Sequence, residues 1–183
     1  MYLRREKKYI KPKFWGKVFW DYMFHYANNA HFMKRNPLEH FRTLSFFIPC
    51  YKCQVEFRRK LRASKLKLKS IHENRLHFLR WVWNYKNEVN KRLGKEQIPF
   101  EEAIKKQFSG KKEHKTFAKF LDTLYLTLPI AEPVVPARYK YTKETVYRET
   151  AQLLGDIITM LRTQTLWDSE RRQNQSSELN CSI

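Results

Sequence analysis

The sequence is poor in cysteine, glycine and acidic residues, and each shortage excludes a class of protein. Three cysteines among 183 residues are too few for the disulfide scaffold of a small secreted protein. Four glycines, together with an aromatic content of 15%, exclude a collagen-like chain and a disordered one. The length is sufficient for one domain with a hydrophobic core and an extension.

Long apolar runs are also missing. No run approaches the roughly 18 residues that a membrane-spanning helix needs. The first residues, "MYLRREKKYIKPKFW", are basic but contain no apolar segment and no small-residue cleavage site, so a secretory signal is not predicted. These absences predict a soluble protein made in the cytosol.

The shortage of acidic residues leaves a large positive charge. The chain has 37 Lys and Arg residues against 18 Asp and Glu, a formal net charge of +19. Basic residues gather before residue 14 and in "RRKLRASKLKLK" at 58–69. Such a surface attracts phosphates, anionic lipids or acidic proteins, and its binding weakens with salt. A cluster of basic residues is equally typical of a surface that contacts only solvent, so charge alone identifies no partner.

Apolar residues recur at helical spacing along almost the whole chain, which predicts an all-α fold. We expect helices over 15–29, 36–49, 50–63 and 74–95, and a short fifth helix over 99–107. Asn36 before Pro37 predicts a helix start, and Gly94 predicts a helix end. Two further amphipathic helices are expected over 115–130 and 142–167, joined by a proline-rich connector at 131–141. The predicted apolar stripe of the last helix is Tyr147, Ala151, Leu154, Ile158 and Leu161.

These segments predict four regions. A basic arm covers 1–13, the main helical domain covers 14–108, and a helical extension covers 109–167. The polar tail, 168–183, carries the third cysteine, Cys181, and is expected to be disordered.

The other two cysteines lie close together in "FFIPCYKCQVEF". Cys50 and Cys53 open a predicted helix directly after Pro49, and a helix N-terminus stabilises a thiolate. A redox-active dithiol is therefore the favoured interpretation. Zinc is an alternative, because His72 and His77 complete the pattern C-x2-C-x18-H-x4-H, although the spacer is longer than in a small zinc finger. Two packed free thiols are a third alternative.

Three stretches in a fixed order resemble a known family. "WGKVFWDYMFHYA", "PCYKC" and "WVWNYKNEVNKRLGK" are similar to Erv/ALR-type FAD-linked sulfhydryl oxidases, most of all to those encoded by large DNA viruses. The resemblance covers about residues 14–105. Its most specific part is "NEVNKRLGK", which resembles the flavin-binding pattern H-N-x-V-N-x-x-L-G-K. It implies a four-helix bundle with a short fifth helix, FAD at the bundle mouth beside the C-x-x-C, and a homodimer.

The resemblance also implies a role for individual residues. Cys50 would exchange with substrate disulfide partners, and Cys53 would be the flavin-proximal sulfur. The implied cofactor contacts come from the first helix, the "NEVNKRLGK" helix and the residue that closes the site; they are Trp20, Phe24, Trp83, Lys86, Asn87, Val89, Asn90, Lys91, Lys95 and Phe100. In this set, the two asparagines would hydrogen-bond the cofactor, and Lys91 and Lys95 would meet its pyrophosphate.

Three of these positions depart from the family pattern. Phe24 stands where the first helix usually has a histidine, with His25 as its neighbour. Lys86 replaces the histidine that begins H-N-x-V-N, and Trp83 replaces a cysteine of a structural disulfide. Phe24 could stack on adenine, and Lys86 could reach a phosphate or the ribose.

The implied activity is oxidation of thiol-containing substrate proteins to disulfides, with reduction of O2 to H2O2. The viral resemblance implies work on virion proteins, in the cytoplasm of an infected cell or in the virion. A second hypothesis is a redox-weak or inactive structural virion protein on the same bundle. Its C-terminal helices would contact capsid proteins, and the basic loop 58–69 would bind nucleic acid or lipid without sequence specificity.

Overall fold

The computed structural model describes residues 11–30, 33, 36–64, 75–109, 113–127, 144–145 and 147–162. Within these ranges all regular structure is helical and no strand occurs, which confirms the predicted all-α class. None of the helices in the described ranges is long and apolar enough to cross a membrane. The predicted connector at 131–141, the tail with Cys181 and residues 65–69 of the basic loop lie outside the described residues.

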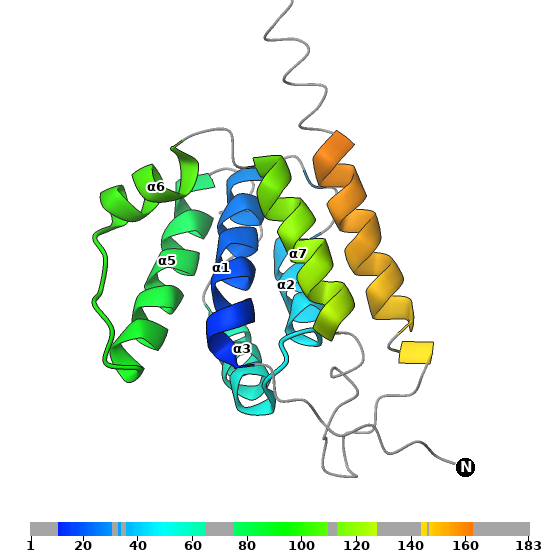
Figure 1. Cartoon of the computed structure of the whole chain (residues 1–183), viewed down its shortest axis with the longest axis horizontal. Helices are drawn as coiled ribbons and strands as arrows, with labels where there is room; N and C mark the ends of the chain where they lie inside the picture. The colour runs from blue at the N-terminus through cyan, green and yellow to red at the C-terminus, as the bar shows by residue number, and fades with distance from the viewer. Residues whose placement is uncertain are drawn as a thin grey trace, which may run out of the picture.

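The helices are arranged around α1. Figure 1 shows α1 in the middle, with α5 and α6 on one side and α7 and the helix over 147–162 on the other. The helix bounds are α1 Pro12–Asn29, α2 Pro37–Ser45, α3 Tyr51–Ala63, α5 Arg75–Arg92, α6 Phe100–Phe108 and α7 Glu113–Thr127. The first four of these, with the short α6, form the bundle expected from the sequence. Residues 58–63 of the basic segment belong to α3 rather than to a loop.

Local chemistry sets the helix ends that the sequence predicted. The Asn36 side chain accepts a hydrogen bond from the Leu38 N–H at 2.9 Å, with Pro37 as the first helical residue. Gly94 ends α5 with φ +65°, the left-handed region that glycine enters without steric cost. The Lys95 N–H then donates to the Asn90 carbonyl at 2.9 Å and closes the last turn.

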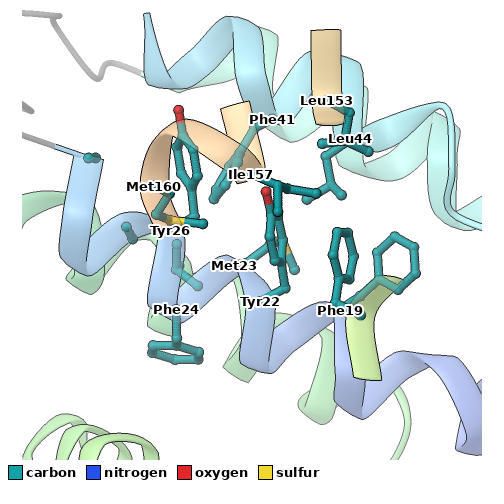
Figure 2. Packing of buried hydrophobic residues seen from close by; sticks show 14 of the residues in the cluster. Phe19, Tyr22, Met23, Phe24, Tyr26, Phe41, Leu44, Leu153, Ile157 and Met160 are labelled. Carbon is teal, nitrogen blue, oxygen red and sulfur yellow. The ribbon is translucent and has the colours of Figure 1, made fainter. Parts of the chain in front are cut away.

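Because α1 is central, it buries side chains on opposite sides. Tyr22 and Tyr26 point towards α2 and the last helix, while Phe24 points to the opposite side, towards α5 (Figure 2). Tyr22 stacks on Phe120 of α7, with ring centroids 3.7 Å apart. One hydrophobic cluster therefore extends from the bundle into the C-terminal helices.

The predicted apolar stripe of the last helix is wrong except at Leu161, which is partly buried against the core. Leu154 and Ile158 are 40% and 49% exposed, and Tyr147 and Ala151 are exposed too. The residues that the helix buries are instead Leu153, Asp156, Ile157 and Met160, of which Figure 2 labels the three apolar ones. This helix has two apolar stripes about one residue apart, and periodicity alone does not indicate which of them faces the bundle.

A buried polar network selects the inward face. The His40 ring of α2 bonds Asp156 Oδ2 through Nδ1 at 2.6 Å and the Tyr22 hydroxyl through Nε2 at 2.9 Å. The same ring stacks on Tyr26 at 3.7 Å. A buried carboxylate needs such partners, so Asp156 must face His40. The network attaches the last helix to α1 and α2.

Candidate functional site

The two neighbouring cysteines form a disulfide at the N-terminus of α3. Cys50 is the N-cap residue, and its Sγ accepts a hydrogen bond from the Cys53 N–H at 3.3 Å. Both cysteines are partly buried against the hydrophobic core. Thus an exchangeable sulfur lies where the amide groups and dipole of a helix stabilise negative charge on it.

A second group of side chains fixes the turn that precedes this disulfide. Gln54 is buried, and its amide nitrogen donates to the carbonyls of Ile48 at 2.8 Å and Phe46 at 3.2 Å. Arg58 donates to the Ser45 hydroxyl at 2.8 Å. Sequence reasoning missed Gln54, although a lone polar residue on the same side of α3 as Phe57 was the available signal.

Ion pairs align α3 with α5. Glu56 pairs with Arg92 at 3.3 Å, and one turn further along α3, Lys60 pairs with Glu88, one turn back along α5. The two helices therefore run antiparallel, and the end of α5 lies beside Glu56, which follows Cys53 by three residues on α3. The "NEVNKRLGK" segment that the sequence singled out thus ends on the side of the bundle that carries the disulfide.

Three of the predicted cofactor residues meet between α1 and α5. The Lys86 ammonium lies 5.2 Å from the centre of the Phe24 ring, and Trp20 contacts Tyr85 at 5.4 Å between ring centroids. Burial lowers the pKa of Lys86 from its usual value, and the negative charge of Asp21 partly opposes this. The two residues that replace family histidines therefore contact each other through a cation–π interaction.

His25 does not take the place of the missing histidine. It packs against Phe108 of α6, at 5.3 Å between ring centroids, and Phe117 of α7, at 6.1 Å. One step around a helix rotates a side chain by about 100°. His25 therefore lies in the contact region of α6 and α7, whereas Phe24 faces Lys86.

Other predicted residues line an open cleft between α5 and residues 97–99, on the side of α5 that faces away from α1. The cleft has a volume of about 430 Å³, and it is lined by Trp83, Asn84, Asn87, Glu88, Lys91, Gln97, Ile98 and Pro99. The Trp83 indole donates to the Ile98 carbonyl at 2.7 Å and packs on Phe100 at 5.5 Å. Phe100, the residue predicted to close the site, is buried and contacts the Trp83 ring.

The two asparagines of the "NEVN" segment hold the loop between α5 and α6. Asn87 donates to the Ile98 carbonyl at 3.0 Å and accepts from the Ile98 N–H at 3.2 Å. Asn90 donates to the Glu96 carbonyl at 3.2 Å. The structure thus gives both residues a loop-positioning role, and their implied contacts with a cofactor stay a prediction.

The predicted cofactor residues fall into two groups. Trp20, Phe24 and Lys86 lie between α1 and α5, with Val89 packed against the core nearby along α5. The others line the cleft or the α5–α6 loop, and Lys95 is exposed where α5 ends.

These residues match the chemistry of a flavin dinucleotide. The cleft is within the usual size range of ligand pockets, roughly 300–1,000 Å³. Trp83 offers an aromatic surface, and Lys91 and Lys95 offer positive charge for a pyrophosphate. The cleft thus offers an aromatic surface and positive charge that suit part of FAD, whereas Phe24 and Lys86 lie between α1 and α5 and do not line it.

The zinc alternative has less support. A disulfide offers no thiolate to a metal ion, and Cys50 and Cys53 are joined in one. Across the described residues, no group of three or more His, Cys, Asp or Glu side chains is placed to hold a metal. His72 lies outside the described residues.

Comparison with known proteins gives one match. A family model described as the Erv1 / Alr family matches residues 13–109, which is more than half of the chain and includes the disulfide, α5 and all the residues that line the cleft. No curated protein and no solved structure matches the chain.

Proposed function

The chain belongs to the Erv1/Alr family, and from this premise we propose that it is an FAD-dependent thiol oxidase that forms disulfide bonds in substrate proteins. The observation that carries the proposal is the Cys50–Cys53 disulfide at the start of α3, within the matched region. Members of this family are generally FAD-linked sulfhydryl oxidases. The disulfide is the group that such an enzyme needs in order to accept electrons from thiols.

The reaction begins with exchange at the disulfide. A substrate thiolate attacks Cys50 Sγ, the Cys50–Cys53 bond breaks, and Cys53 leaves as a thiolate. The second substrate thiolate then attacks the substrate sulfur of the mixed disulfide and releases Cys50. The Cys53 N–H and the start of α3 stabilise the departing Cys50 thiolate, which favours this second step. The result is one substrate disulfide and a reduced cysteine pair that holds two electrons.

FAD would accept these two electrons and deliver them to O2, which becomes H2O2. The residues proposed to hold it are Trp83 and Lys91 in the cleft, with Phe24 and Lys86 between α1 and α5. Gln54 keeps the turn before Cys50 in place, and Asn87 keeps the α5–α6 loop in place. These two residues therefore position the site without reacting.

The test is to purify the full chain, record its visible spectrum and follow O2 consumption with dithiothreitol. We expect a bound-flavin band at roughly 450 nm and turnover that is lost in Cys50→Ser and in Cys53→Ser. Cys181→Ser is the matched control and should keep full turnover, because Cys181 lies outside the matched region. A colourless protein that carries stoichiometric zinc would contradict the proposal.

A second candidate is a structural protein that binds anionic surfaces through the same bundle. The net charge of +19 favours it, since such a charge attracts nucleic acid and anionic lipid. A colourless, metal-free protein with salt-sensitive binding to DNA would support this candidate over the oxidase. The homodimer, the viral substrates and the contacts of the C-terminal helices with capsid proteins stay predictions from the resemblance.

A further inference from the structure

One face of α3 is exposed and begins beside the disulfide. Tyr51 and Val55, on the first two turns, are 42% and 40% exposed although both are large apolar side chains. Arg59 and Arg62 continue the same stripe towards the end of the helix, and both are exposed. Figure 1 shows α3 at the lower edge of the molecule. An apolar surface next to Cys50 thus leads into a cationic one.

The cationic part has a charge excess that its neighbours do not cancel. α3 contains five basic residues and one acidic residue, Glu56. Glu56 already pairs with Arg59 at 2.8 Å and with Arg92 of α5 at 3.3 Å. From α5, Arg92 adds a positive charge beside Glu56, and Glu88, which pairs with Lys60, adds one negative charge, so the excess stays positive. A partner that covers the face must therefore bring negative charge.

Helix geometry gives the spacing that such a partner needs. At about 1.5 Å per residue, Val55 lies roughly 8 Å from Cys50 along the helix axis, Arg59 roughly 14 Å and Arg62 roughly 18 Å. An extended peptide advances about 3.3 Å per residue. An apolar side chain about two positions from the reacting cysteine, and acidic side chains about four and five positions from it, would match the face.

We propose that this face of α3 is the substrate-docking surface, and that it selects extended cysteine-containing segments with a nearby apolar residue and an acidic flank. The inference rests on the proposed oxidase function. When the acidic flank meets Arg59 and Arg62 and the apolar residue meets Tyr51 and Val55, the substrate cysteine is held next to Cys50 Sγ. There its thiolate makes the first exchange, forming a mixed disulfide as Cys53 leaves.

A second copy of this chain does not fit the face. Pairing the face with itself would bring Arg59 and Arg62 against like charges, and like charges across an interface are costly. Nucleic acid would meet the arginines but would not account for two exposed apolar residues at the end nearest the disulfide. We therefore commit to an acidic protein segment and treat nucleic acid as an outcome of the test.

The experiment uses the full flavin-loaded chain and two synthetic dithiol peptides. The peptides share their cysteines and a leucine two positions away, and they differ only in carrying either two Glu or two Lys residues at the fourth and fifth positions. We expect kcat/KM for the acidic peptide to exceed that for the basic peptide at least about tenfold at low salt. The preference should shrink towards unity at about 0.5 M salt, where the screening length is only a few ångströms.

Two double variants with the same change of net charge distinguish the effect of this face on peptide preference from the effect of the overall charge. Arg59→Glu/Arg62→Glu should abolish or invert the peptide preference. Lys115→Glu/Lys119→Glu, on the exposed side of α7, should leave it unchanged. Tyr51→Ser/Val55→Ser should lower kcat/KM for both peptides by a similar factor. All three variants should oxidise dithiothreitol as the parent does, because this small neutral thiol needs no docking.

The outcomes keep the two proposals apart. Equal kcat/KM for the two peptides, or equal effects of the two charge reversals, would overturn the docking surface while dithiothreitol oxidation still supports the oxidase. If dithiothreitol is not oxidised, the oxidase proposal fails, and docking is then measured directly by the fluorescence anisotropy of labelled, reduced peptides. Binding of the acidic peptide that is lost in Arg59→Glu/Arg62→Glu would still support the docking surface. If Arg59→Glu/Arg62→Glu removes binding to a DNA duplex and leaves peptide preference intact, the face is a nucleic-acid surface and the docking proposal fails.

Discussion

At the scale of single residues, the contact between Phe24 and Lys86 concentrates the unusual chemistry of this chain. A partly buried ammonium loses hydration, and the aromatic ring returns part of that loss. A cation with a depressed pKa beside an aromatic face is suited to contact an anionic or electron-rich group. At the two positions where the resemblance implies histidines, the pair thus supplies an aromatic ring and a cation instead.

Tyr85 gives a prediction about alkaline stability. Burial is the main cause that raises its pKa from 10.0 to about 12, while Arg92 opposes the rise. Between these pH values the folded chain keeps the phenol proton and the unfolded chain loses it. The free energy of unfolding should therefore fall as the pH rises from about 10 to 12, with a contribution from Tyr85 of about 2–3 kcal/mol.

Tyr85→Phe should lose less stability over this pH range than the parent, measured by urea unfolding at pH 9 and 11.5. Tyr125→Phe is the matched control, because Tyr125 is 77% exposed, and it should follow the parent curve. Identical curves for all three proteins would show that the buried phenol does not contribute.

At the scale of elements, α3 and α5 build the site, and ion pairs between their side chains hold the two helices together. The pairs Glu56–Arg92 and Lys60–Glu88 align the two helices. Gln54 fixes the turn before the disulfide, and Asn87 fixes the loop beside the cleft. The helices therefore provide rigid supports, while the ion pairs, Gln54 and Asn87 set the positions of the disulfide and the cleft relative to them.

Asn87→Ala tests the loop connection. It removes two hydrogen bonds with Ile98, and we expect the free energy of unfolding to fall by about 1–2 kcal/mol. The Ile98 amide should also exchange its hydrogen faster, because its acceptor is lost. Asn84→Ala, which changes another residue of the same cleft, should affect neither measurement. Unchanged exchange at Ile98 would refute the loop-positioning role.

At the scale of the whole molecule, the C-terminal helices complete the core of the bundle. Phe120 of α7 stacks on Tyr22 of α1, and Leu153 and Ile157 pack into the same cluster. The His40–Asp156 pair joins segments 116 residues apart in the sequence. The extension thus forms part of the support of α1, which carries Trp20 and Phe24 on its other side.

Asp156→Ala tests this support. The substitution removes the carboxylate that bonds the buried Nδ1 of His40, and a buried polar group that loses its hydrogen-bond partner costs about 1–3 kcal/mol. Urea unfolding should record this loss, and a hydrophobic dye should bind more strongly as the last helix separates from the bundle. Asp122→Ala, on the exposed side of α7, should be within about 0.5 kcal/mol of the parent. A similar cost for both substitutions would argue against the network.

The sequence by itself determined the features that depend on neighbouring residues. The Asn36–Pro37 start, the Gly94 end, the helical class and the position of the C-x-x-C at a helix N-terminus all follow from chemistry within a few residues. The order of the three resembling stretches also pointed to the family that the family model matches.

Only the tertiary structure decided which of two equivalent local patterns is used. Periodicity in the last helix allowed two inward faces, and the partner of Asp156, far away in the chain, selected one of them. Similarly, Asn87 and Asn90 look like ligand-binding residues in isolation, yet the α5–α6 loop folds back and takes their hydrogen bonds. In both cases a polar group is satisfied by a partner outside its own helix, and the periodic pattern of that helix carries no information about the partner.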